Sequence, residues 1–284
     1  MSNDLRTLSS EFSIDEAKTI ANQYYGLNQF ICQLPNEHDQ NFLFHHEQSK
    51  FILKISNIDE IYSVIHMQNR AMEHINNRIS LANYRPHTSK LIFNLEKLRG
   101  QIDKSLMKFK DECAKRDIYW NIINAEYIIN KYKNLIIDKN HRQIIENILK
   151  DWIEIVVPLF SSLRQSIIHN DANDYNITVM DEVAVACAYI ILNKQDPIDS
   201  ATYLIRDYNQ INQFEDIEID LFYYFICARL AMSVTICAHQ KQIQPDNHYL
   251  VISEKPAWDL LEKLTTIDIK FINQTFRSAC TTSN

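Results

Sequence analysis

Glycine and proline are scarce in this chain. Only 2 of its 284 residues are glycine, Gly26 and Gly100, and 6 are proline. Antiparallel barrels and sandwiches need many tight turns, and a glycine-rich phosphate loop needs several glycines close together. The scarcity therefore argues against both and favours a fold rich in helices.

Cysteine pairs and clusters of basic residues are lacking too. The 6 cysteines are scattered without a Cys-x-x-Cys pair, and most lie in apolar sequence, which is typical of buried thiols in a reducing cytosol. The net charge of −7, with no cluster of Lys and Arg, gives no general attraction to nucleic acid or to an anionic membrane. The first residues show no signal-peptide pattern. We expect a cytoplasmic protein without nucleic-acid or membrane partners, and no pattern indicates an oligomeric state.

Long apolar runs are limited to the segment Leu221–Ala238. It contains Arg229 and the polar residues Ser233 and Thr235. A segment that spans a bilayer is more uniformly apolar, so we expect a core helix.

The composition is that of a soluble globular protein, with 46% hydrophobic and 23% charged residues, and the length allows one large domain or two lobes. Ser13 followed by Glu16 is a capping-box pattern, which predicts a helix that ends at Gly26. Residues 29–56 predict three short strands of one antiparallel meander. A helix over Tyr62–Arg78 should follow, with Ile65, Met72 and Ile75 on one face.

The rest of the chain has the periodicity of helices. One apolar stripe begins near residue 95 and another near residue 120, and a long helix over His141–Leu163 should bend at Pro158. Further helices are expected near Glu182–Leu192, Asp199–Gln210, Glu215–Gln240 and Ser253–Ser278.

One polar stretch interrupts this helical region. The sequence Ile167-Ile-His-Asn-Asp-Ala-Asn-Asp-Tyr-Asn-Ile177 predicts a strand, a tight loop and a second strand. Its His-x-Asp, with Asn five residues after that Asp, is the catalytic-loop spacing of kinase-fold phosphotransferases. Asp171 suits a general base, the amide oxygen of Asn176 suits a metal ion, and His169 would brace the turn. The alternative is that these residues only cap and staple a surface turn.

Lys54 favours the first interpretation. It lies in the alternating strand Phe51-Ile-Leu-Lys-Ile, and Glu73 on the following helix could pair with it. A strand Lys and a helix Glu form the ion pair that holds nucleotide phosphates in kinase-fold proteins. The other explanation for Lys54 is an edge residue that points to solvent.

These residues belong to segments that resemble a known superfamily. The loop is similar to that of the aminoglycoside phosphotransferase and choline kinase superfamily, and the whole chain resembles its hydroxylysine kinase branch and the kinase domains fused to class III aminotransferases. The resemblance runs from about residue 12 to 275 and is carried by Pro35-Asn-Glu-His-Asp-Gln-Asn-Phe, Phe51-Ile-Leu-Lys-Ile-Ser, Ile168-His-Asn-Asp-Ala-Asn-Asp-Tyr-Asn, Ala228-Arg-Leu-Ala-Met-Ser-Val-Thr and Ser253-Glu-Lys-Pro-Ala-Trp.

The resemblance implies an α+β, protein-kinase-like fold of two lobes. Residues 1–85 would form a reduced, β-rich N-terminal lobe, and residues 86–284 a mostly helical C-terminal lobe. It implies a kinase that uses ATP or GTP with Mg²⁺ on a hydroxyl of a small amino-containing metabolite. Lys54 would hold the nucleotide phosphates, Glu73 would orient Lys54, Asp171 would be the base and Asn176 a metal ligand.

Two departures from the family pattern lead to a second hypothesis. The strand hairpin with a second metal-binding Asp is missing after Asn176, where the chain runs into a predicted helix at Asp181, and Asp181 would cap that helix. The segment between Glu73 and the next helix is too short for two more strands and a hinge. The alternative function is therefore a catalytically impaired, kinase-like binding module.

Overall fold

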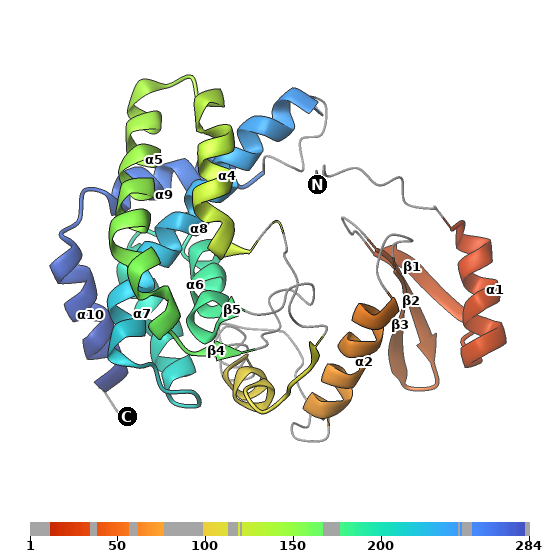
Figure 1. Ribbon diagram of the computed structural model, residues 1–284. Helices are drawn as coiled ribbons and strands as arrows, with labels where there is room; N and C mark the ends of the chain where they lie inside the picture. The colour runs from red at the N-terminus through yellow and green to blue at the C-terminus, as the bar shows by residue number, and fades with distance from the viewer. Residues whose placement is uncertain are drawn as a thin grey trace. The chain divides into compact units, whose positions relative to one another are not determined.

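The computed structural model describes residues 12–34, 39–56, 62–76, 99–112, 119, 121–166, 177–243, 245 and 252–281. The chain divides into two compact units, an N-terminal unit of Met1–Asn69 and a C-terminal unit of Arg70–Asn284. Figure 1 shows a small sheet with one helix beside it in the first and a group of helices in the second. The predicted lobe boundary at residue 85 lies outside the described residues and stays a prediction.

The N-terminal unit begins with helix α1 (Ile14–Tyr25). The predicted capping box is confirmed, because the Glu16 amide donates to the Ser13 hydroxyl and the Glu16 carboxylate accepts from the Ser13 amide. The helix ends at Gly26, which adopts the left-handed conformation with φ 68°. Both ends of α1 are therefore set by local sequence.

Gly26 is one of only two glycines in the chain, and its conformation explains its presence. A Cβ added there meets nothing within 4 Å, so a side chain would cost only backbone strain. We expect Gly26→Ala to lower the free energy of unfolding by about 1 kcal/mol. Gly26→Asn should lose less, since Asn tolerates this conformation. Urea denaturation measures both, and an equal loss in the two variants would contradict the backbone explanation.

Three strands form the predicted antiparallel meander: β1 (Gln29–Leu34), β2 (Gln40–His46) and β3 (Ser49–Ile55), in the order β1-β2-β3. One face packs against α1 in a core formed by Ala17, Ala21, Leu27, Phe42, Phe44 and Leu53. Tyr24 and Tyr25, in the last turn of α1, are 69% and 65% exposed. They follow Ala21 at spacings of three and four, for which helix periodicity predicts burial, but the buried row of α1 ends at Ala21.

Helix α2 (Tyr62–Asn76) confirms the predicted helix but not its buried face. Val64, Met67, Ala71 and Ile75 are buried, whereas Met72 is 53% exposed. The buried positions follow one another at spacings of three and four, and the small Ala71 completes the row. Of the predicted row, Ile75 is therefore buried, whereas Met72 lies outside the row of buried positions.

The C-terminal unit is mainly helical (Figure 1). Residues 99–106 are helical, and the following elements are η2 (Ile122–Asn124), α4 (Ala125–Tyr132), η3 (Lys133–Leu135), α5 (Lys139–Asp151), η4 (Trp152–Val156), η5 (Val157–Ser162), β4 (Gln165–Ser166), β5 (Ile177–Thr178), α6 (Val179–Ile190), α7 (Pro197–Asn209), α8 (Asp216–Ile243), α9 (Glu254–Leu264) and α10 (Ile269–Thr281).

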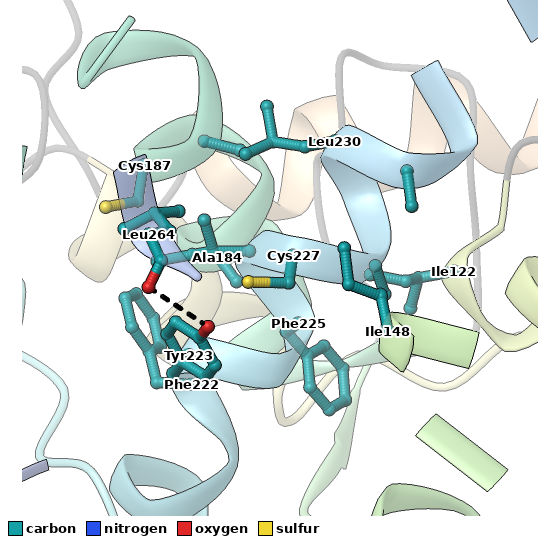
Figure 2. Packing of buried hydrophobic residues seen from close by; sticks show 14 of the residues in the cluster. Ile122, Ile148, Ala184, Cys187, Phe222, Tyr223, Phe225, Cys227, Leu230 and Leu264 are labelled. Atoms are coloured by element: carbon teal, nitrogen blue, oxygen red, sulfur yellow. Dashed lines mark hydrogen bonds between the residues drawn. The ribbon is translucent and has the colours of Figure 1, made fainter. Parts of the chain in front are cut away.

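Helix α8 is the centre of this unit. Phe222, Phe225, Cys227 and Leu230 are buried on its different sides, and α4, α5, α6, α9 and α10 all contact it (Figure 2). The Tyr223 hydroxyl donates to the backbone carbonyl of Leu264 on α9 at 3.5 Å. By length and composition α8 could cross a membrane, but 78% of its apolar window is buried. The prediction of a core helix is confirmed.

Two predicted helices are divided in the structure. The segment 141–163 keeps its buried face of Ile145, Ile148, Trp152 and Val156, but it changes from α through π to 3₁₀ geometry, with Pro158 in the 3₁₀ part. The segment 253–278 forms both α9 and α10.

The break between α9 and α10 has a local cause. Directly after α9, the hydroxyls of Thr265 and Thr266 donate to the backbone carbonyls of Glu262 and Lys263 at 2.9 and 2.7 Å, which satisfies carbonyls of its last turn. Asp268 then accepts a hydrogen bond from the Lys270 amide and starts α10.

Candidate active site

The predicted polar loop is closed at its base by a short ladder. Strands β4 and β5 pair antiparallel, with Gln165 opposite Thr178 and Ser166 opposite Ile177. This confirms a strand at Ile177, after the loop, whereas the predicted strand residues Ile167 and Ile168 lie outside the described residues. So do His169, Asp171 and Asn176, and their roles stay predictions. The ladder holds the two ends of segment 167–176 together.

The segment that follows β5 is as short as the sequence predicted. Helix α6 begins at Val179, directly after Thr178, the last residue of β5. Residues 177–190, all of which the structure describes, therefore contain no further strand between β5 and α6. Asp181 is the third residue of α6 and so lies inside the first turn, not at the N-cap position. The hairpin that would carry a second metal-binding carboxylate has no room here.

Lys54 lies on the sheet face opposite α1. Its ammonium is 2.7 Å from the carboxylate of Asp39, directly before β2. Glu73 lies on α2 in the C-terminal unit with an exposed side chain, and its pairing with Lys54 stays a prediction. The Asp39 contact was not foreseen, because Asp39 precedes Lys54 by fifteen residues and reaches it only through the pairing of β2 with β3.

The surroundings of Lys54 are mostly apolar. Asn41 on β2 lies between Lys54 on β3 and Leu34 on β1, and Leu43 on β2 lies opposite Ile52 on β3. These side chains therefore share the face of the sheet that points away from α1. Ile52 is 59% exposed. An open apolar face that ends in a lysine can bind a ligand with a flat apolar part and an anionic part.

The C-terminal unit contains a buried polar cluster that the sequence did not predict. Arg99 lies 3.1 Å from Glu182 on α6, and the Tyr208 hydroxyl on α7 donates to Asp103 at 2.7 Å. Burial, and then the charge of Glu182, raise the pKa of Asp103 well above its ordinary value. Arg99 and Asp103 have helical i,i+4 spacing. That spacing was the one signal in the sequence, and it does not show that the pair is buried.

The same cluster extends to the base of the loop. Arg164, directly before β4, donates from Nε and Nη2 to Glu218 at 2.9 and 2.5 Å. It also donates to the Gln213 carbonyl at 2.8 Å and to Asn212 at 3.5 Å. Glu218 is completely buried, so this bidentate pair is shielded from water.

Several other polar residues make contacts that are explained by the fold alone. The Arg229 guanidinium lies over the Tyr189 ring at 5.6 Å. Asp196 accepts from the Asp199 amide at the start of α7, so it begins a helix. Within the described ranges no group of three or more His, Cys, Asp or Glu residues could hold a metal ion. His45 and His46 on β2 therefore belong to no such group.

A surface hollow of about 670 Å³ lies beside η2 and α4. It is lined by Ile123, Asn124, Glu126, Tyr127, Asn130 and Lys131. The Lys131 ammonium lies 5.6 Å from the centre of the Tyr127 ring and 5.1 Å from that of Tyr132. These cation–π contacts account for the position of Lys131 without a ligand.

Sequence comparison finds relatives over nearly the whole chain. No protein-family profile matches. Hydroxylysine kinase of Mus musculus is 22% identical over 346 aligned positions, which cover 93% of this chain and 92% of the relative. Because 93% of 284 residues is about 264, roughly 80 of these positions have a residue in the mouse protein and none here. The chain is therefore shorter than this relative inside the matched region.

Structure comparison finds the same kind of fold. An amicoumacin kinase in complex with AMP-PNP and Ca²⁺ has a TM-score of 0.63 at 11% identity, with 92% of this chain and 97% of that chain covered. A spectinomycin phosphotransferase in complex with ADP and spectinomycin has a TM-score of 0.52 at 10% identity, with 95% and 99% covered. The predicted two-lobe, kinase-like α+β fold class is confirmed. By sequence the chain is similar to hydroxylysine kinases, and its fold is that of two small-molecule phosphotransferases.

Proposed function

We propose that this chain transfers the terminal phosphoryl group of ATP or GTP to a hydroxyl of a small amino-containing metabolite, with hydroxylysine as the first candidate. The observation that supports this most is the short ladder β4–β5, which closes a loop with the His169, Asp171 and Asn176 spacing. The names of the relatives supply the acceptor class: one acts on hydroxylysine.

In the proposed reaction the acceptor oxygen forms a bond to the γ-phosphorus as the bond from that phosphorus to the β–γ bridging oxygen breaks. Asp171 takes the proton from the attacking hydroxyl, and the nucleoside diphosphate leaves with the bridging oxygen. Lys54 holds the phosphates by its positive charge. Bringing acceptor and phosphoryl group together supplies much of the rate enhancement.

Mg²⁺ is the expected metal because the reaction needs charge neutralisation on the phosphates, and Asn176 would give it one amide oxygen. The fit is incomplete, since β5 runs directly into α6 and the described residues there supply no second carboxylate strand. The first described acid after the loop with a placed side chain is Glu182, whose carboxylate lies against Arg99 inside the protein.

The incomplete metal site favours a second candidate function, a kinase-like module that binds nucleotide or metabolite without rapid transfer. The direct join of β5 to α6 and the roughly 80 aligned positions without a residue here both support it. Both functions require nucleotide binding. They differ in whether Asp171→Asn changes turnover.

Nucleotide binding can be tested with a natural probe on the sheet. Cys32 is exposed and pairs with Leu43, on the face that carries Lys54. Burial raises the pKa of Cys227 to about 12 and those of Cys237 and Cys280 to about 11, so these thiols react slowly near pH 8. We expect AMP-PNP to slow alkylation of Cys32, measured by mass spectrometry of the peptide that contains it.

Lys54→Met should weaken this protection by raising the required AMP-PNP concentration about 10- to 100-fold, the value of a charge-assisted hydrogen bond. Lys50→Met is the matched control, because Lys50 lies on the same strand four residues away, opposite His45. Equal protection in wild type and Lys54→Met would contradict the role of Lys54. No protection in the wild type would contradict nucleotide binding on this face.

A further inference from the structure

A continuous chain of polar contacts connects the two sides of the loop base. It begins at Arg164, one residue before β4, and passes to the side-chain oxygen of Asn212 at 3.5 Å. The Asn212 amide donates to the Tyr208 hydroxyl at 2.9 Å, and that hydroxyl donates to Asp103 at 2.7 Å. Glu182, four residues after the end of β5, faces Asp103 from α6.

The helix that carries Asp103 packs very closely against this region. A Cβ at Gly100 would lie 3.1 Å from the Ile211 Cβ, and the Lys104 ammonium donates to the Ile211 carbonyl at 3.0 Å. Asp103 is completely buried and Glu182 is 1% exposed. Water therefore has no ready access to the two carboxyl groups.

One carboxylate oxygen in this cluster lacks a donor. Asp103 Oδ2 accepts from Tyr208, but Oδ1 is buried with no hydrogen-bond partner among the described residues. The Glu182 carboxyl is a neighbour of the Asp103 side chain. An ionised carboxylate carries no hydrogen, so it cannot donate to Asp103. An orphan acceptor beside a second carboxyl is satisfied when one proton lies between them.

Charge balance leads to the same conclusion. Asp103 faces Arg99 from its own helix, Glu182 from α6 and Tyr208 from α7. Among the described residues the Arg99 guanidinium brings one positive charge beside these two buried carboxyl groups, and one added proton leaves the three groups neutral together. The second cation nearby, Arg164, is already paired with Glu218.

We propose that Asp103 and Glu182 share one proton, and that this buried pair positions the ends of the loop 167–176 through Tyr208, Asn212 and Arg164. Asp103 and Glu182 are positioning residues, since they act on the loop through its base. Any effect of the two carboxyl groups on turnover rests on the proposed kinase function. The shared proton and the positioning of β4 and β5 do not depend on it.

The shared proton predicts a pH dependence of stability. The pKa of Asp103 is raised in the folded chain, so above the ordinary Asp value of 3.8 folding takes up a proton. The stabilisation from this proton is fully present below that value and is lost as the pH rises toward the folded-state pKa. Over that window the unfolding equilibrium constant should increase by up to about tenfold per pH unit.

Urea denaturation between pH 5.5 and pH 8.5, together with the variant Asp103→Asn, measures this dependence. Asn at 103 imitates the protonated acid, because it can accept from Tyr208 and donate to Glu182. We expect Asp103→Asn to fold and to lose the proton-linked part of the slope, whereas Glu146→Gln on the surface of α5 should keep it. Identical slopes in wild type, Asp103→Asn and Glu146→Gln would overturn the shared proton.

Hydrogen exchange tests the hold on the loop. Glu182→Gln removes the ionic contact with Arg99 and should speed exchange of the β4 and β5 amides about tenfold or more, with Glu146→Gln unchanged. Unchanged exchange in Glu182→Gln would overturn the positioning role. In an active enzyme the same variant should lower kcat and leave the KM for nucleotide unaltered. A wild type without activity would refute the proposed function, and the denaturation and exchange results would still decide this inference.

Discussion

Asp171→Asn should lower the rate of phosphoryl transfer about 100- to 10,000-fold, the usual contribution of a general base. Asn has nearly the same shape as Asp but cannot take the proton of the attacking hydroxyl. The measurement is nucleoside diphosphate release with a panel of hydroxylated amino acids, beginning with hydroxylysine. Nucleotide affinity, followed by Cys32 protection, should not change.

Asp174→Asn is the matched control, because it makes the same substitution three residues along the same loop. It should retain most of the activity. Equal, background-level turnover in the wild type and in Asp171→Asn would refute the kinase function and support the binding module. A comparable loss of turnover in Asp171→Asn and Asp174→Asn would show that the reaction depends on the total negative charge of the loop. It would contradict the assignment of Asp171 as the general base.

Trp152→Ala should cost about 3–5 kcal/mol of unfolding free energy, since it removes a large buried side chain and leaves a cavity. Trp152 is 2% exposed and packs edge-on against the Phe225 ring at 5.2 Å, where α5 passes into the π segment. The Phe225 side chain belongs to the central helix α8, so the cavity would open in the middle of the C-terminal unit.

The neighbouring residue provides the control for this substitution. Ile153 is 39% exposed, so Ile153→Ala should cost about 1 kcal/mol or less. Urea denaturation followed by far-ultraviolet circular dichroism measures both variants. A loss below about 1 kcal/mol for Trp152→Ala would show that the unit collapses around the cavity, against the expectation of a tightly packed core.

Features that depend on a few neighbouring residues could be predicted well. The capping box of Ser13 and Glu16, the left-handed Gly26 and the strand after the polar loop follow from side chains that act within one turn or one strand. The direct passage from β5 into α6 was visible for the same reason, because apolar sequence continues without a turn signal after Thr178.

Helix breaks and the burial of single side chains were predicted less well. The sequence periodicity continues from residue 253 to 278, but α9 ends at Leu264 and α10 begins at Ile269, after Asp268 accepts from the Lys270 amide. Met72 is exposed although it is apolar, and Tyr24 is exposed although it follows the buried Ala21 at helical spacing. Helix spacing shows which residues share a face, but not how far along the helix that face is covered.

By itself the sequence determined most of the helices and strands in their order, including β5 after the predicted polar loop and the strand that carries Lys54. Only the tertiary structure decided that Lys54 lies against Asp39, and that Asp103, Glu182 and Tyr208 meet inside the C-terminal unit. The physical reason is the range of the interactions. Caps and periodicity act over three or four residues, whereas Asp103 and Tyr208 are 105 residues apart and Arg99 and Glu182 are 83 apart. Such contacts exist only once the helices have packed.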